Sequence, residues 1–187
     1  YFRKDLDTLR PEEVTKRVQT TVNVYTDRNG EVLWEDKGDG NYKLVVKSED
    51  LSDNLKKATI AVEDKDFYKH GGVSISALSR AFINNLGGGK IQGGSTLTQQ
   101  LVKQVFFSEE AKDRTLTGIP RKIKEAILSI ELERMYDKDQ ILTLYLNESP
   151  YGGRRNGAES GARTYFGKSA KDLTIAEAAL LAGIPNN

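Results

Sequence analysis

The amino-acid sequence predicts a mainly α-helical protein with a small β-hairpin near its N-terminus. From about residue 50 onwards, apolar residues recur at the three- and four-residue spacing of amphipathic helices. Before that point, residues 20–25 and 31–35 are two runs of β-forming residues on either side of the turn Asp27-Arg28-Asn29-Gly30. The chain has 187 residues, which is enough for one domain with a sizeable core and a small appendage.

Each further element has its own signal. Residues 42–46 are expected to add a third strand after a Gly-Asp-Gly turn. Apolar stripes predict helices around residues 55–62, 75–86, 97–105, 123–130 and 137–146, and five glycines within residues 87–94 predict a flexible loop. A Thr-Ile-Ala-Glu capping box predicts a last helix that follows Thr174 and ends at Gly183. We therefore place a linker with the hairpin at residues 1–49 and the main domain at residues 50–187.

Composition excludes several classes of protein and site. The 28 Lys and Arg residues nearly balance the 27 Asp and Glu residues, and a net charge of +1 argues against a nucleic-acid binder. There is no Cys and only one His, so disulfides, a Cys nucleophile and zinc–thiolate or multi-His sites are excluded. No signal peptide or apolar run of about 18 residues is present. Because the chain starts at Tyr1 rather than Met and stops at Ile184-Pro185-Asn186-Asn187, we expect it to be a piece of a longer protein, with a truncated C-terminus.

Residues 63–72 are the first cluster that could carry chemistry. Glu63 and Asp64 are expected at the C-terminal end of a helix, where the helix dipole disfavours an acid by roughly 0.3–1 kcal/mol. A carboxylate held there beside Phe67 would suit a general base, because burial raises the pKa of a carboxyl group. The alternative is a solvated acidic cluster paired with neighbouring lysines. His70 is expected to form structural hydrogen bonds rather than to act as a catalyst.

A glycine-rich loop leads into the second candidate segment, residues 93–103. On a helix, Thr96, Gln99, Gln100 and Lys103 share one face, opposite an apolar stripe. A helix that starts after glycines suits an anion, but the lysine lies two turns in, which is the wrong place for a nucleotide-binding P-loop. An ordinary amphipathic helix explains the same residues equally well.

The third candidate is a cation cluster around residues 121–125. Arg121 and Glu125 share one helix face, which Leu128 and Leu132 continue, so we expect protein to cover it. Another face carries an apolar stripe of Ile123, Ala126, Ile127 and Ile130. Four cations and one acid between Arg114 and Glu125 suit a phosphate or pyrophosphate, with or without a divalent metal. The alternative is a set of salt bridges on the helix surface.

The order of these signals is more specific than any one of them. The chain contains Glu-Asp-x-x-Phe-x-x-His, then Gly-Gly-Ser-Thr-x-x-Gln-Gln, then Arg-Lys-x-x-Glu, and then Lys-x-x-Ile-Leu-x-x-Tyr-Leu-Asn. In this order the motifs resemble the peptidoglycan glycosyltransferase (transglycosylase) domain of class A penicillin-binding proteins and of monofunctional glycosyltransferases. The resemblance covers residues 20–187.

The resemblance implies a lysozyme-like helical fold with a large lobe, a small lobe and a cleft between them. It implies an enzyme of cell-wall synthesis that polymerises lipid II, a disaccharide-peptide on undecaprenyl pyrophosphate, into β-1,4 glycan strands. The nascent glycan chain is the donor, and the acceptor hydroxyl displaces its pyrophosphate with inversion. The implied location is the extracytoplasmic face of the bacterial cytoplasmic membrane, with an N-terminal anchor that this chain lacks.

The same resemblance implies the site residues. Glu63 matches the general base, and Glu125 matches a second acid that assists the pyrophosphate or its divalent metal, Mg²⁺ or Mn²⁺. No organic cofactor is implied, and moenomycin-type inhibitors are expected in the donor site. The implied substrate-binding residues are Asp64, Phe67, His70, Ser95, Thr96, Gln99, Gln100, Lys103, Arg114, Arg121 and Lys122. Of these, Lys103, Arg121 and Lys122 match residues that hold the pyrophosphate.

Two stretches depart from the family's pattern. The segment between Lys103 and Arg121 is several residues longer than usual, which leaves the match of Arg114 to a further pyrophosphate arginine open. Residues 148–155, Glu-Ser-Pro-Tyr-Gly-Gly-Arg-Arg, replace a more usual aromatic-glycine stretch, so we expect the lobe nearby to be reshaped. Between the first two motifs, the residues expected to contact the membrane surface are Ile75, Phe82, Ile83, Leu86 and Ile91.

Two other functions stay open at this point. A lysozyme-like hydrolase or lytic transglycosylase cleaves glycan with a single Glu acid and has no need of a cation cluster. A non-catalytic glycan-binding module has no need of both Glu63 and Glu125. The hairpin is compatible with a transpeptidase domain in the same full-length chain but does not establish one.

Overall fold

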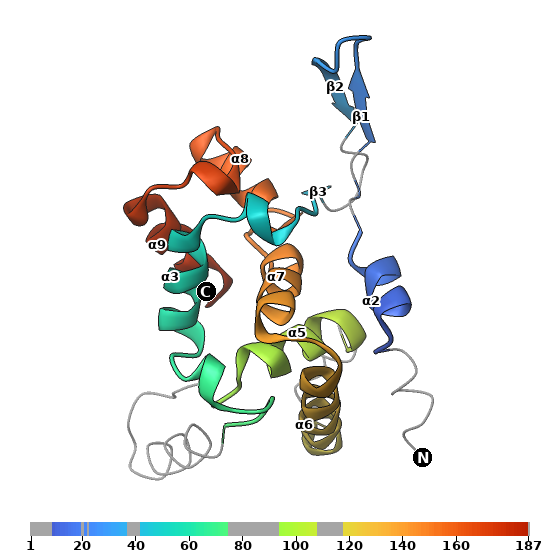
Figure 1. Cartoon of the computed structure of the whole chain (residues 1–187), viewed down its shortest axis with the longest axis vertical. Helices are drawn as coiled ribbons and strands as arrows, with labels where there is room; N and C mark the ends of the chain where they lie inside the picture. The colour runs from blue at the N-terminus through green and yellow to red at the C-terminus, as the bar shows by residue number, and fades with distance from the viewer. Residues whose placement is uncertain are drawn as a thin grey trace. The chain divides into compact units, whose positions relative to one another are not determined.

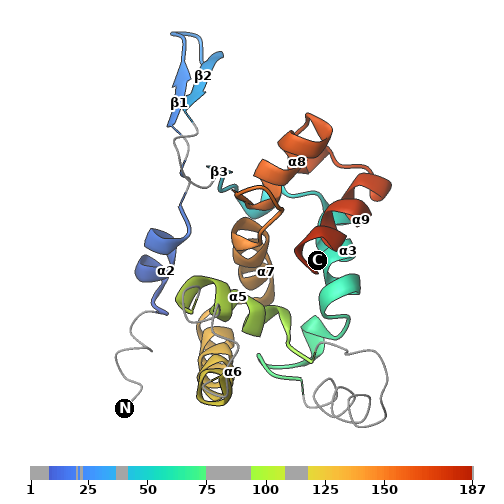
Figure 2. The same ribbon diagram turned by 180° about the vertical axis from the view of Figure 1, so that it is seen from behind.

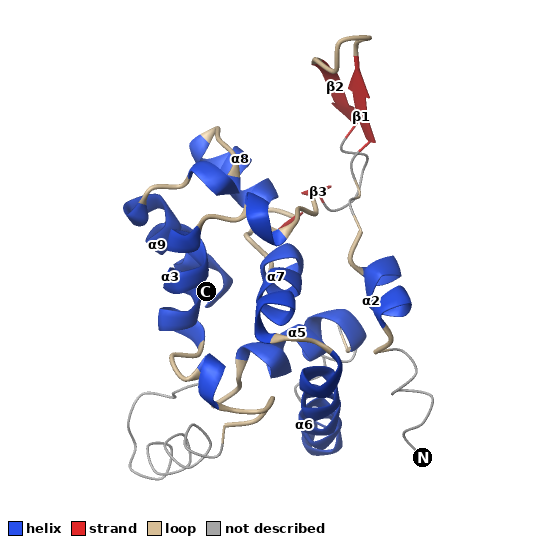
Figure 3. Ribbon diagram, viewed as in Figure 1, coloured by secondary structure: helices blue, strands red, loops and turns tan. Residues whose placement is uncertain are grey.

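A computed structural model describes residues 9–19, 21, 23–36, 42–74, 94–107 and 118–186. In these residues the predicted fold class is confirmed, because helices dominate and one small antiparallel hairpin lies near the N-terminus (Figures 1 and 3). The chain forms two compact units: the first comprises Tyr1–Val14 and Ile60–Tyr145, and the second comprises Thr15–Thr59 and Leu146–Asn187. The units interleave along the sequence, so the predicted division after residue 49 stays a prediction.

The first unit is built from helices. It contains α5 (Leu97–Phe106), α6 (Gly118–Met135), the 3-10 turn η2 (Phe67–Lys69), and parts of α2 (Pro11–Arg17), α3 (Asp53–Glu63) and α7 (Lys138–Glu148). Helix α5 packs on α6, and the two lie side by side when the molecule is seen from behind (Figure 2). The buried apolar side chains of the two helices, such as Leu101 and Leu128 at 1% exposure each, leave water almost completely, which provides the main driving force for this packing. The largest buried side chains of this unit include Phe67, Leu97, Leu101, Leu128, Leu132 and Tyr145.

The polar face of α6 is the one that the protein buries. Glu125 is 0% exposed and Leu128 is 1% exposed, whereas Ile123 is 56% exposed. Ile127 and Ile130 are also among the exposed apolar residues. The expectation that protein covers the face of Arg121 and Glu125 is therefore confirmed, and the isoleucine stripe points to solvent instead.

The second unit contains the hairpin. Strands β1 (Asn23–Thr26) and β2 (Val32–Asp36) pair antiparallel, as predicted. The Asp27 carboxylate accepts hydrogen bonds from the backbone N–H groups of Asn29 and Glu31, and Gly30 supplies a φ of 86°. An Asp that bonds backbone groups two and four residues on stabilises a tight turn in this way.

The predicted third strand forms, but it is shorter than the predicted residues 42–46. Strand β3 comprises only Tyr42–Lys43, and it pairs parallel with β4 (Arg155–Asn156) instead of extending the hairpin. The reason is that residues after β3 bond elsewhere in the unit: the Leu44 N–H donates to Ser160 Oγ at 2.8 Å. A pairing between residues more than 100 positions apart leaves no local signal in the sequence.

The other elements of the second unit are short. They are η1 (Ser48–Asp50), α8 (Ala158–Phe166), η4 (Ala170–Asp172), α9 (Ile175–Gly183) and η5 (Ile184–Asn186). The capping box predicted for α9 is present, with Thr174 and Glu177 bonding each other's backbone. Helix α8 was not predicted, because its buried face consists of small residues rather than a stripe of large apolar ones. Gly161 on that face approaches the Tyr151 ring and Leu181 closely.

Some predictions lie outside the described residues. They are the helix over residues 75–86, the loop over residues 87–93, Arg114, and the membrane-contacting residues Ile75, Phe82, Ile83, Leu86 and Ile91. Among the helices that the structure describes, none combines the length and the apolar character needed to cross a bilayer.

Candidate active site

Glu63 is the last residue of α3, and its carboxyl group is partly buried. Gln100 Nε2 donates a hydrogen bond to Glu63 Oε2 at 2.8 Å, while Tyr145 donates to Gln100 Oε1 at 3.3 Å and so orients the amide. The other carboxylate oxygen, Oε1, is buried and has no hydrogen-bond partner among the described residues. Burial raises the pKa of Glu63 above its usual value, the nearby Asp64 charge adds to the rise, and the Gln100 hydrogen bond opposes it.

Asp64 connects the end of α3 to the start of α5. Its Oδ2 accepts the backbone N–H of Leu97 at 3.0 Å and lies 2.9 Å from His70 Nε2. The side chains of Asp64 and His70 are only 8% and 9% exposed. Leu97 is the first residue of α5, where a free N–H and the helix dipole both favour a carboxylate. His70 thus forms a hydrogen bond as predicted, while its predicted contact with substrate stays a prediction.

The Gly-Gly-Ser-Thr motif builds the N-terminus of α5. Thr96 and Gln99 form a reciprocal capping box, and Thr96 Oγ1 also donates to the carbonyl of Gly72 at 2.6 Å. Thr96 is 1% exposed and Gln99 is 5% exposed, so the two side chains are occupied by the cap rather than displayed on a free polar face. Their predicted contact with substrate stays a prediction.

Gly72 lies directly against α6. Its φ is +84°, and a Cβ there would come within 2.5 Å of the backbone oxygen of Ser129. Ser129 in turn donates its hydroxyl to the carbonyl of Glu125 at 2.6 Å. Only glycine combines this φ with this approach, so Gly72 sets the distance between the Glu63–His70 segment and the helix that carries Glu125.

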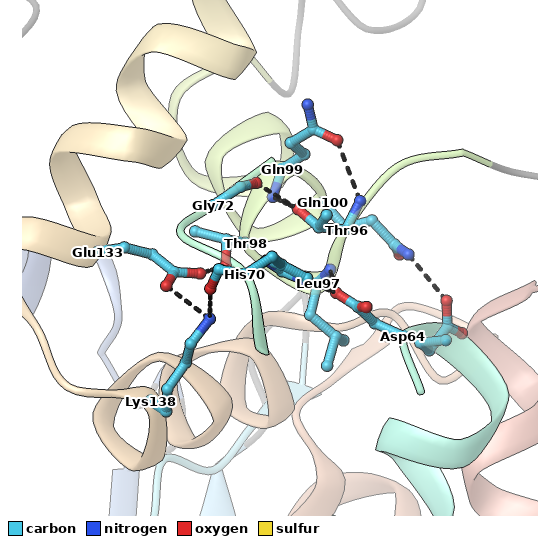
Figure 4. A network of polar contacts seen from close by, with 11 residues as sticks. Asp64, His70, Gly72, Thr96, Leu97, Thr98, Gln99, Gln100, Glu133 and Lys138 are labelled. Carbon is cyan, nitrogen blue, oxygen red and sulfur yellow. Dashed lines mark hydrogen bonds and ion pairs between the residues drawn. The ribbon is translucent and has the colours of Figure 1, made fainter. Parts of the chain in front are cut away.

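A polar network that sequence reasoning missed supports this arrangement (Figure 4). Lys138 Nζ lies 2.6 Å from both the His70 carbonyl and Glu133 Oε2, and it stands 4.4 Å from the centre of the Phe67 ring. Thr98 donates to the other Glu133 oxygen at 2.6 Å. Lys138 begins the fourth motif, which was a signal for its importance, whereas Thr98 and Glu133 carried no distinctive spacing.

The cation cluster surrounds a fully buried acid. Arg121 Nε lies 3.2 Å from Glu125 Oε1, and Lys122 Nζ lies 2.8 Å from Oε2. These contacts are ion pairs without hydrogen-bond geometry, so they stabilise the carboxylate through its charge. Lys122 is half exposed and also donates to Ser95 Oγ at 2.9 Å. Lys103 on α5 is partly buried and makes no ion pair with any residue that the structure describes.

The structure therefore connects most of the predicted residues in two groups. One group links Glu63 to Gln100, and Asp64 to His70 and to the start of α5. The other links Ser95 and Lys122 to Glu125 and Arg121. Arg114 lies outside the described residues.

A metal site on the chain itself does not fit these residues. In the part of the chain that the structure describes, no three His, Cys, Asp or Glu side chains come together as a metal-binding cluster. The Glu125 carboxylate already has two cationic neighbours, which would repel a divalent ion. Glu125 could supply one ligand at most, so the divalent metal stays a prediction and no step below depends on it.

Residues 29–187 match the family model described as "Transglycosylase". The chain belongs to the transglycosylase family. This transglycosylase chain is 40% identical over 169 residues to penicillin-binding protein 1A of Clostridium tetani, which covers 88% of the chain and 20% of that protein. It is 43% identical over 141 residues to penicillin-binding protein 1F of Bacillus subtilis, which covers 75% of the chain and 19% of that protein. Penicillin-binding protein 1A of Neisseria flavescens is 46% identical over 141 residues, which cover 75% of the chain and 17% of that protein.

The transglycosylase chain thus spans about a fifth of the length of these curated relatives. The family that the ordered motifs predicted is confirmed. The roles of the individual site residues are not tested by these similarities.

Proposed function

We propose that the chain is the peptidoglycan glycosyltransferase part of a longer penicillin-binding protein and polymerises lipid II into β-1,4 glycan strands. The observation that carries the proposal is the partly buried Glu63, whose pKa burial raises and whose Oε1 is left without a hydrogen-bond partner among the described residues. A general base needs a pKa closer to the working pH than that of a solvated carboxylate, and it needs a free oxygen to take the proton.

In the proposed reaction, Glu63 Oε1 takes the proton from the 4-hydroxyl of the lipid II acceptor. The hydroxyl oxygen forms a bond to the anomeric carbon of the donor glycan as the bond from that carbon to the pyrophosphate oxygen breaks. The electron pair leaves with the pyrophosphate, whose charge the cations Lys103, Arg121 and Lys122 stabilise. Attack opposite the leaving group inverts the anomeric centre and gives a β linkage from an α-linked donor.

Gln100 and Asp64 act as positioning residues in this proposal. Gln100 holds Glu63 Oε2, which leaves Oε1 without a hydrogen-bond partner among the described residues, and Asp64 anchors the segment after the base to α5. The other predicted residues hold Gln100, Asp64 and the cation cluster in place. They are Phe67, His70, Ser95, Thr96 and Gln99.

A lytic transglycosylase or glycan hydrolase is the second candidate. Its leaving group is a sugar hydroxyl, so it gains nothing from a buried carboxylate that holds Arg121 and Lys122 in place. The cation cluster therefore favours polymerisation, in which the leaving group carries a pyrophosphate charge.

The deciding experiment is incubation of the chain with labelled lipid II, with and without a chelator. We expect longer glycan products from the wild type, no polymer from Glu63→Gln with lipid II binding retained, and normal polymer from Glu131→Gln, a matched change on α6. A fully active Glu63→Gln variant would refute the assignment of the base, and shortened glycans would favour the lytic reaction. Lys103→Ala should weaken use of the donor without unfolding the chain.

For the full-length protein, we propose a membrane anchor and the extracytoplasmic face of the bacterial cytoplasmic membrane as its site. The names of the relatives and their five-fold greater length support this proposal and a transpeptidase domain in the same protein. Moenomycin-type inhibitors should compete with the donor for the cation cluster.

A further inference from the structure

The second unit contains a pocket of about 440 Å³ that the proposed reaction does not use. Its wall comes from strands β2 and β3, the turn before β4, the start of β4, and helix α8. The polar residues that line it are Glu35, Tyr42, Arg154, Arg155, Arg163 and Thr164. Three guanidinium groups in one pocket are unusual, because like charges repel and each needs a compensating acceptor.

The charges that line the pocket do not balance. Arg163 is neutralised, since its Nε lies 2.7 Å from Glu159 and its NH1 lies 3.1 Å from Glu35. Arg155, in contrast, donates from Nε to Thr164 Oγ1 at 3.0 Å and from NH1 to the Gly153 carbonyl at 3.1 Å. Both of these acceptors are neutral, and no ion pair with a described acid is formed by Arg155. The guanidinium group of Arg155 is therefore held in a fixed orientation, and no described acid neutralises its charge.

The backbone at Arg154 adds an independent sign of function. Among the residues that the structure describes, Arg154 is the only one other than glycine with a positive φ, 62°. The conformation is held in place because the Arg154 carbonyl accepts the Tyr42 N–H at 2.9 Å. A glycine would adopt this conformation without strain, so an arginine here is expected to contribute through its side chain.

We infer that this pocket binds an oxyanion, a carboxylate or phosphate group carried by a larger ligand. The planar fork of an arginine matches two oxygens of either group, and charge-assisted pairs of this kind are the strongest hydrogen bonds available. The volume leaves room for the part of the ligand that carries the anion.

Amide NMR titrations of the whole chain test this inference with two probes, inorganic phosphate and N-acetylalanine, which carries one carboxylate. We expect saturable shifts at Arg155 and Thr164, and the tighter probe identifies the preferred anion. Arg155→Gln should weaken binding about ten-fold, because it removes a charged hydrogen-bonding group. Arg134→Gln removes an arginine from the exposed surface of α6, where its side chain is 75% exposed, and should leave the affinity unchanged.

Arg154→Gly separates binding from folding. It places glycine where the backbone favours it, so thermal stability should be maintained or increased while affinity for the anion falls several-fold. Equal affinities in the wild type, Arg154→Gly and Arg155→Gln would overturn the inference, and so would an absence of saturable shifts with both probes. The titration involves no lipid II, so its outcome is independent of the proposed glycosyl transfer.

Discussion

Replacing Asp64 by Ala should destabilise the first unit substantially. One carboxylate oxygen serves both the Leu97 N–H, at 3.0 Å, and His70 Nε2, at 2.9 Å, and the side chain is 8% exposed. The substitution removes two charge-assisted hydrogen bonds and the carboxylate at the N-terminus of α5. A hydrogen bond to a charged group contributes about 1.5–3 kcal/mol, so we expect a loss of about 3 kcal/mol or more.

Thermal unfolding followed by circular dichroism measures this loss. For a chain of this size, about 3 kcal/mol corresponds to a fall of roughly 6–12 °C in the melting temperature. Asp64→Asn keeps a neutral oxygen as an acceptor and should show about half of the effect. Asp66→Asn is the matched control, because Asp66 pairs with Lys69, which is 78% exposed, and surface pairs contribute about 0–1 kcal/mol. Equal melting temperatures for Asp64→Ala and Asp66→Asn would refute the reasoning.

Three further predictions concern stability. Burial raises the pKa of Glu63 above its ordinary 4.5, so ionisation of this carboxyl group destabilises the folded state as the pH rises. Glu63→Gln should therefore resist unfolding by urea better than the wild type at neutral pH. The difference should vanish in acid, where Glu63 is protonated. A less stable variant at neutral pH would contradict this sign. Gly72→Ala should lower the free energy of unfolding in urea by at least about 2 kcal/mol, because Gly72 has a positive φ and lies against the α6 backbone. At Gly71 an added Cβ would meet nothing within 4 Å, so Gly71→Ala should leave the stability nearly unchanged. Similar losses of unfolding free energy in the two variants would show that α6 shifts easily to make room for a Cβ at residue 72. Lys43→Met should lower the free energy of unfolding by about 3–5 kcal/mol, because it removes the cation that lies 2.6 Å from the largely buried Glu148 carboxylate. The Lys43→Met/Glu148→Leu double variant should recover most of that free energy. A double variant as unstable as the single one would mean that the cost is not that of an unpaired charge.

The features that sequence reasoning predicted are those that depend on neighbours along the chain. The stripe over residues 97–105 corresponds to α5, and the turn at Asp27 and the capping box at Thr174 form as expected. Each of these signals lies within a few residues of the structure it produces. The cap at Thr96 has the same Thr-x-x-Gln spacing as a capping box, so it could have been predicted by the same rule.

The features that were missed depend on partners far away in the sequence. The β3–β4 pair joins residues more than 100 positions apart, and the Thr98–Glu133–Lys138 network joins three helices, α5, α6 and α7. Helix α6 is a different case, because it has apolar residues on two faces: the sequence predicted that protein covers the face of Arg121 and Glu125, but it did not predict that the isoleucine face is exposed. The orientation of that helix is decided by the burial of Glu125, Leu128 and Leu132 together.

The outward isoleucines of α6 have a consequence for how much variation the helix tolerates. Side chains at positions 123, 127 and 130 are 56%, 37% and 47% exposed, so a randomised library should accept more large, small and charged residues there than at enclosed positions. Positions 125, 128 and 132 are enclosed, and the same library should recover few alternatives at them. The helix would then show a pattern of tolerance opposite to the one that its hydrophobicity alone suggests.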